Sequence, residues 1–265
     1  MANDKPKNND SIGRTFLVVF VLCLVCSIVV AGSAVGLKAQ QQEQKLLDKQ
    51  RNILDVAGLL KPAMTASEIT AVYNSRIQPE LLNLKTATVE KNAGNFDLNN
   101  ALRSDESSMA LSPEQDLAKI RRRADMAEIY LVKDEQGKTT QLVLPVYGSG
   151  LWSMMYAFVS IDVDGVTSRG ITYYSQGETP GLGGEVENPA WRHQWIGKKL
   201  YTPEGVPALK VVRGGAGNNP YGVDGLSGAT LTSNGVQHMF DFWLGDHGFG
   251  PFLKKVREGA LKDGR

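Results

Sequence analysis

An uncharged apolar run near the N-terminus constrains the fold of this chain more than any other feature. From Thr15 to Leu37 no residue carries a charge, and valine and leucine dominate. As a helix, about 23 residues at ~1.5 Å rise each span ~35 Å, enough to cross the hydrocarbon core of a bilayer. We therefore expect a transmembrane helix at 15–37, preceded by a short N-terminal tail at 1–14.

A cleaved signal peptide is the alternative for this run. Arg14 supplies a positive flank, and Gly32-Ser33-Ala34 offers small residues at a plausible cleavage site. The run is long for the apolar part of a signal peptide, which favours the anchor. Basic residues stand on both sides of it, so charge alone does not predict its orientation.

The residues at 38–125 are expected to form a helical linker and the N-terminal part of a soluble domain. A broken apolar stripe continues a helix over 40–60. The capping box formed by Thr65 and Glu68 then opens a second helix, and Pro79 marks its end.

Strand patterns dominate the middle of the chain. Residues 82–90 alternate like a strand, 91–112 predict an irregular loop, and Ser112-Pro113 has the pattern of a helix start. Four further β-type runs follow, at 127–133, 140–146, 154–162 and 170–175. Strands in series between helices predict an α+β fold: a single N-terminal transmembrane helix, then one soluble domain with a mainly antiparallel sheet flanked by helices. The part at 126–265 is expected to form the ligand-binding domain.

Several functional classes are disfavoured by composition and motifs. The formal net charge is +1, which gives no general signature of nucleic-acid binding. Both cysteines, Cys23 and Cys26, lie in the apolar run, and the three histidines lack metal-ligand spacing. The chain has no nucleophile elbow, Walker loop or dinucleotide-binding fingerprint. We therefore predict no catalytic residue, no metal site and no binding of NADH by this chain itself.

A loop rich in small residues and hydroxyls, Asp224-Gly-Leu-Ser-Gly-Ala-Thr-Leu-Thr-Ser233, precedes a predicted amphipathic helix. That helix should begin near Thr232 or Ser233, because apolar residues then recur at helical spacing. The unpaired amides of a first helical turn stabilise an anion, so a phosphoryl group on Thr230 would be well placed. The alternative is a glycine-containing turn with an ordinary Ser/Thr helix cap.

Ser227-Gly228-Ala229-Thr230, preceded by Asp224, resembles the covalent flavinylation motif of the FMN-binding domain family. Two further segments of this chain, Gly148-Ser-Gly-Leu-Trp152 and Glu178-Thr-Pro-Gly-Leu-Gly183, stand in the order and approximate separation found in that family. The resemblance implies that FMN is attached to Thr230 through a phosphoester.

The three segments also supply candidate contacts for the flavin. Leu151 and Trp152 could cover one face of the ring, and Pro180-Gly181 predicts a type II turn whose polar groups could face the flavin or its ribityl chain. The cofactor-binding residues expected beside Thr230 are Ser227, Gly228, Ala229, Leu231, Thr232, Gly150, Leu151, Trp152, Glu178, Thr179, Gly181 and Leu182.

Within this family the chain resembles the C subunits of bacterial sodium-translocating NADH:quinone reductases. The resemblance implies an electron relay inside an NADH:ubiquinone oxidoreductase that pumps sodium, with other membrane, flavin and iron–sulfur subunits as partners. It also implies a flavin transferase that loads FMN from FAD, and a single-pass anchor in the bacterial inner membrane with a periplasmic domain. The alternatives are a G subunit of an Rnf-type electron-transport complex, or a flavin-free assembly or binding module.

Overall fold

The computed structural model describes residues 11–90 and 96–261, which belong to two units. One unit ends at Asp48 and the other begins at Lys49, within the 45-residue helix α1 (Ile12–Val56). Of the described residues, only α1 is long and apolar enough to cross a membrane, with a mean hydropathy of 2.9 in its 18-residue apolar window. The predicted helical continuation beyond residue 40 is confirmed as far as Val56.

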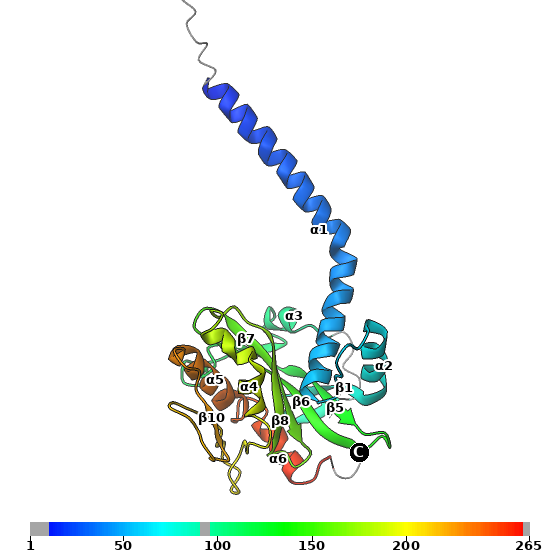
Figure 1. The fold of residues 1–265 in the computed structure, drawn as a ribbon, viewed down its shortest axis with the longest axis vertical. Helices are drawn as coiled ribbons and strands as arrows, with labels where there is room; N and C mark the ends of the chain where they lie inside the picture. Colours follow the sequence, from blue (N-terminus) through cyan, green and yellow to red (C-terminus); the bar gives the residue numbers. More distant parts are fainter. Residues whose placement is uncertain (1–10, 91–95, 262–265) are drawn as a thin grey trace, which may run out of the picture. The chain divides into compact units, whose positions relative to one another are not determined.

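An antiparallel sheet of six strands forms the centre of the second unit (Figure 1). Each strand pairs with its neighbours in antiparallel register. In spatial order the strands are β2 (Thr88–Glu90), β1 (Ile77–Asn83), β5 (Met126–Lys133), β6 (Thr139–Ser149), β7 (Met154–Asp162) and β8 (Ser168–Ser175). The four predicted strands that follow residue 126 are therefore confirmed, as is the α+β class.

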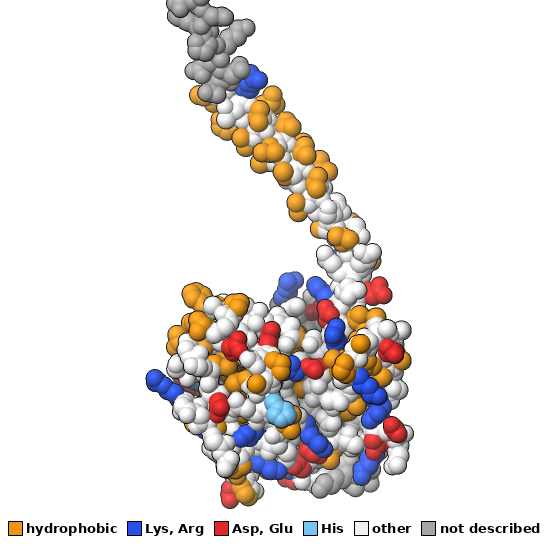
Figure 2. Space-filling model, in the orientation of Figure 1, with side chains coloured by type: hydrophobic (Ala, Val, Ile, Leu, Met, Phe, Trp, Pro, Cys, Tyr) orange, Lys and Arg blue, Asp and Glu red, His pale blue; other side chains and the backbone are white. Residues whose placement is uncertain are grey.

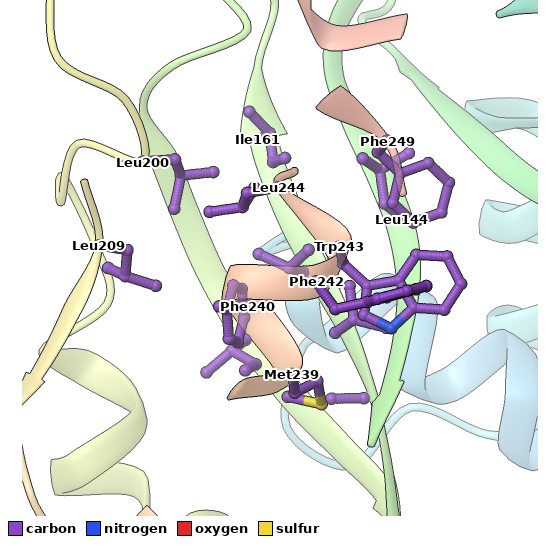
Figure 3. Close-up of a cluster of buried hydrophobic side chains, with 14 of the residues drawn as sticks. Leu144, Ile161, Leu200, Leu209, Met239, Phe240, Phe242, Trp243, Leu244 and Phe249 are labelled. Carbon is purple, nitrogen blue, oxygen red and sulfur yellow. The ribbon is translucent and has the colours of Figure 1, made fainter. Parts of the chain in front are cut away.

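One face of the sheet is covered by the C-terminal helices α5 (Thr230–Trp243) and α6 (Gly250–Arg257). Alternate residues of β6 and β7 face this core, since a strand turns successive side chains to opposite faces. Figure 3 shows Met239, Phe240 and Trp243 of α5 among the buried side chains. The apolar stripe predicted for this helix is confirmed, and it fixes α5 against the sheet.

The opposite face of the sheet carries the last turns of α1 and the helix α2 (Ala66–Arg76). Ile53 and Leu54 of α1 are fully buried there. The Thr172 hydroxyl of β8 donates a hydrogen bond to the Asp55 carboxylate over 2.9 Å, and Arg192 pairs with the same carboxylate. The base of α1 is thus part of the compact unit.

Four sequence predictions before residue 126 need correction. The capping box at Thr65 is confirmed, but α2 ends at Arg76 and Pro79 lies inside β1. The strand predicted at 82–90 is a hairpin of β1 and β2, because the Asn83 side chain accepts hydrogen bonds from two turn amides.

The predicted helix start at Ser112 is also wrong. The segment forms turns, because the Asp116 carboxylate accepts hydrogen bonds from the amides of Ile120 and Arg121, at 2.7 and 2.8 Å. The predicted loop at 91–112 lies partly outside the described residues, and its remainder contains a short helix and a short strand. The smaller elements are α3 (Leu98–Leu102), β3 (Ser108–Ala110), β4 (Arg122–Ala124), η1 (Gly183–Glu187), α4 (Pro189–His193), β9 (Lys210–Val212) and β10 (Gly222–Asp224).

Candidate functional site

The N-terminus of α5 has no side-chain cap. The helix begins at Thr230, two or three residues earlier than predicted, and Ala229 occupies the N-cap position without a capping hydrogen bond. Within the described residues the amides of Thr230, Leu231 and Thr232 have no hydrogen-bond partner. Free amides at the positive end of a helix dipole bind phosphate well. The structure therefore does not support the Ser/Thr-cap alternative.

Burial separates the four hydroxyls of this loop into two pairs. Thr232 and Ser233 are buried, and their hydroxyls donate to the Glu178 carboxylate at 2.6 Å and the Ala229 carbonyl at 3.0 Å, respectively. Ser227 and Thr230 are exposed. Of these two, Thr230 stands on the first turn of the helix, beside the free amides.

The Glu178 carboxylate joins all three sequence segments. It accepts hydrogen bonds from the amides of Leu151, Trp152 and Ser153 at 3.1, 2.9 and 3.2 Å, besides the bond from the Thr232 hydroxyl. The residue is only 4% exposed. The segments that the sequence groups into one site are thus in direct contact.

Two glycines make room for this carboxylate. A Cβ added to Gly150 would lie 2.5 Å from Glu178 Oε1, and one added to Gly183 would lie 2.5 Å from the Thr232 hydroxyl oxygen. Real Cβ atoms do not approach other atoms so closely. Gly183 ends the second sequence segment but was not predicted as a site residue, and its place beside Glu178 is the reason that the segment needs glycine there.

Hydrogen bonding lowers the pKa of Glu178. Burial by itself raises this pKa, but the Thr232 hydroxyl and the three amides stabilise the carboxylate more strongly, so the pKa lies below its ordinary value. A carboxyl group with a lowered pKa stabilises the fold above its unfolded-state pKa, and the contribution is lost as the pH falls through the folded-state value.

We expect this contribution in a comparison of wild type with Glu178→Gln. The difference in the free energy of unfolding should be largest above about pH 5 and should shrink as the pH falls below about 4, where the carboxyl becomes neutral like the amide. Urea unfolding of both proteins across that range measures the difference. A difference that stays constant with pH would contradict the assigned pKa direction.

The segments that meet at the first turn of α5 carry exposed apolar side chains. Trp152 is 71% exposed and Leu231 is 60% exposed, while Leu151 and Leu182 are about half exposed. Figure 2 shows hydrophobic side chains gathered over the β7 and α5 side of the compact unit. Trp152 is therefore not a core tryptophan. A flat apolar ligand next to Thr230 would cover this surface.

The remaining predicted contacts lie on exposed turns at the same site. The Leu182 amide donates to the Thr179 carbonyl at 3.1 Å and Gly181 has φ +75°, which confirms the type II turn at Pro180-Gly181. A Cβ added to Gly228 would lie 3.1 Å from Leu182 Cδ2, so this turn touches the loop before α5.

Asp224 and Ser153 hold the loops of the site in place through hydrogen bonds. The Asp224 carboxylate accepts from the Ala216 amide at 2.5 Å, and its backbone carbonyl accepts from the Trp191 indole at 2.7 Å. Asp224 therefore ties the loop before α5 to the segments that carry Ala216 and Trp191. The hydroxyl of Ser153, which the sequence did not single out, accepts from the Gly177 amide at 2.6 Å, and the Ser153 amide donates to Glu178.

The fold and the site together define an FMN-binding domain. A family model with that description matches residues 150–245, which include every contact predicted for the flavin. The site combines an exposed hydroxyl, free helix amides for a phosphate, and an apolar surface for a flat ring.

The similarity to known proteins extends over the whole chain. The C subunit of the Na(+)-translocating NADH-quinone reductase of Yersinia pestis is 65% identical over 266 residues, covering 100% of both chains. Its counterpart in Vibrio alginolyticus is 57% identical over 256 residues, covering 96% of this chain and 98% of that one. The crystal structure of Shewanella oneidensis NqrC matches with a TM-score of 0.75 at 36% identity, covering 83% of this chain and 100% of that chain.

A second solved structure, of the corresponding protein from Parabacteroides distasonis, matches with a TM-score of 0.63 at 27% identity, covering 82% of this chain and 96% of its own. The chain belongs to the family of C subunits of Na⁺-translocating NADH-quinone reductases. This membership decides against the G subunits of Rnf-type complexes.

Proposed function

We propose that this chain is a membrane-anchored flavoprotein subunit that carries FMN on Thr230 through a phosphoester. In this role it relays electrons within a sodium-translocating NADH:quinone reductase. The observation that carries the proposal is the exposed Thr230 hydroxyl at the uncapped first turn of α5, where segments with exposed apolar side chains meet. The names of the relatives support the assignment to this reductase.

Each part of the site has a distinct role in this proposal. Bound FMN supplies the one- and two-electron chemistry, as cofactors generally do. The free amides of Thr230, Leu231 and Thr232 hold the phosphate, and Leu151, Trp152, Leu182 and Leu231 cover the ring. The small residues Ser227, Gly228 and Ala229 leave room for the phosphate to approach the helix. The turn that contains Thr179 and Gly181 presents its polar groups to the flavin or its ribityl chain.

Attachment is a transfer to the Thr230 oxygen. A separate flavin transferase would join that oxygen to the phosphorus of the FMN half of FAD, break the anhydride bond and release AMP, with the hydroxyl proton passing to solvent or to a base of the transferase. The exposure of Thr230 allows such an enzyme to reach it. A covalent bond then prevents loss of the cofactor during turnover.

The proposal places α1 in the bacterial inner membrane at 15–37, with the domain in the periplasm. The apolar window of α1 supports the anchor. The other subunits of the reductase are the expected partners, because a relay needs centres that deliver and remove electrons. The exposed surface around Trp152 would leave part of the ring near solvent, where a partner's cofactor can approach.

Mass spectrometry of the full-length chain tests the attachment. Expressed together with its transferase, the wild-type chain should gain the mass of one FMN less one water, on the peptide that contains Thr230. Thr230→Val should lose this addition completely, because valine keeps the shape but has no oxygen to esterify.

Ser227→Ala is the matched control, since Ser227 is the other exposed hydroxyl of the loop. This variant should keep the addition on Thr230. An addition that disappears with Ser227→Ala but not with Thr230→Val would move the site to Ser227. An unmodified wild-type chain made beside active transferase would favour the flavin-free assembly module.

A further inference from the structure

We propose that Glu178 is a positioning residue for the flavin: its carboxylate holds the loop Leu151–Ser153 against the first turn of α5, so that the apolar surface stands beside Thr230. This inference rests on the proposed attachment of FMN. It assigns Glu178 a role through other residues of the site and not a direct contact of its carboxylate with the cofactor.

Protein donors fill the hydrogen-bonding capacity of the carboxylate. Oε1 accepts from the amides of Trp152 and Ser153, and Oε2 accepts from the Leu151 amide and the Thr232 hydroxyl. An ionised carboxylate has about four lone-pair sites and no donor. With four donors bound to it and 4% of the residue exposed, Glu178 has no acceptor site left for the ribityl hydroxyls or the ring.

Side-chain packing does little to fix the loop. Trp152 is 71% exposed and Leu151 is 47% exposed, so burial supplies little of the energy that places them. Within the described residues, the Leu151 and Trp152 amides donate only to Glu178. The ring-covering side chains are therefore placed by their backbone. Ser153 also accepts hydrogen bonds from the amides of Gly150 and Gly177 at 2.8 and 2.6 Å, but the amides of Leu151 and Trp152 themselves are held by the one carboxylate.

The position of Thr232 links this carboxylate to the attachment site. Thr232 lies two residues after Thr230 in the first turn of α5, and its buried hydroxyl donates to Glu178 at 2.6 Å. The negative charge is also stabilised by the positive end of the helix dipole. One carboxylate thus ties the surface that would cover the ring to the turn that would hold the phosphate.

The test compares Glu178→Gln with wild type, using the full-length chain in mild detergent. Glutamine keeps the size of the side chain, but its NH₂ group cannot accept a hydrogen bond from an amide. In the flavin-free protein, hydrogen exchange at the Leu151–Ser153 amides should become at least about tenfold faster, as expected from the loss of a charge-assisted hydrogen bond. Unchanged protection of these amides would overturn the proposal.

A second readout uses the flavin-loaded protein. Attached FMN, seen as fluorescence that survives denaturation, should persist in Glu178→Gln because Thr230 is intact. Quenching of that fluorescence by iodide should at least double, and the visible circular dichroism of the flavin should weaken, since the ring is less well covered. If Glu178→Gln shows the same iodide quenching and the same flavin dichroism as wild type, the positioning role is contradicted.

Glu135→Gln is the matched control, because Glu135 is exposed in the turn between β5 and β6 and the charge change is identical. It should leave both readouts unchanged; equal effects of the two variants would also overturn the proposal. If Glu178→Gln does not fold, Thr232→Val can replace it, because this variant removes one of the four donors to the carboxylate. It should change the amide exchange and the flavin quenching in the same direction as Glu178→Gln. Unchanged values of both in Thr232→Val would contradict the proposal. Absence of covalent FMN from wild type would refute the attachment, while the amide exchange would still decide the role of Glu178.

Discussion

Replacing Trp243 with alanine should lower the free energy of unfolding by about 3–5 kcal/mol, the usual cost of removing a large aromatic side chain from a core. Trp243 is 2% exposed, and its ring lies within about 5 Å, centroid to centroid, of the rings of Tyr147, Phe242 and Phe249. Its indole also donates to the Tyr147 carbonyl at 2.7 Å. The substitution therefore creates a cavity and removes a buried hydrogen bond.

Trp152→Ala is the matched control for this prediction. The chemical change is the same, but Trp152 is 71% exposed, so its loss should change the free energy of unfolding by only about 0.5 kcal/mol or less. Denaturant unfolding of the flavin-free protein, followed by circular dichroism, measures both variants. Equal destabilisation by the two substitutions would mean that the α5 core does not dominate the stability of the domain.

The elements predicted correctly are those whose pattern is local. Strands β5 to β8 alternate or run apolar between clear turn signals, and the stripe of α5 repeats at helical spacing. The Thr65 capping box likewise closes over three residues, with the Glu68 carboxylate accepting from the Thr65 amide at 2.7 Å. Interactions over so few residues can be derived from sequence alone.

The apolar spacing placed the start of α5 two to three residues too late, because it does not show which partners the hydroxyls before the stripe have. Thr232 donates to Glu178, 54 residues away in the chain, and Ser233 donates back to the Ala229 carbonyl. The helix therefore begins at Thr230 with alanine at the N-cap. A residue's own sequence neighbourhood does not reveal which distant group its side chain will meet.

For the candidate site as well, some features could be predicted from the sequence and others could not. The three motifs indicated which segments belong together, and the structure brings Glu178, the Leu151–Ser153 loop and the first turn of α5 into contact. The direction of the Glu178 side chain could not be predicted, because it depends on the space that Gly150 and Gly183 leave. The FMN contacts of the individual residues stay predictions, as does a domain boundary at 126.

Gly235→Ala should destabilise the domain by about 1–3 kcal/mol, the usual cost of overpacking. A Cβ on Gly235 would lie 2.5 Å from the Ser149 carbonyl oxygen and 3.1 Å from Gly150 Cα, and both of these are backbone atoms. Backbone cannot move aside as a flexible side chain does, so α5 would have to shift away from the end of β6. Denaturant unfolding of the flavin-free variant measures the loss.

The neighbouring Asn234→Ala gives this prediction a control of opposite sign. Asn234 is exposed on the same helix, where alanine has the higher helix propensity, so this variant should be stabilised by up to about 0.7 kcal/mol. Helix propensity alone would stabilise Gly235→Ala as well, by about 1 kcal/mol. A stabilised Gly235→Ala protein would therefore show that α5 does not pack directly on the Ser149-Gly150 backbone. A destabilised one would confirm the close approach that brings the first turn of α5 within reach of the loop carrying Leu151 and Trp152.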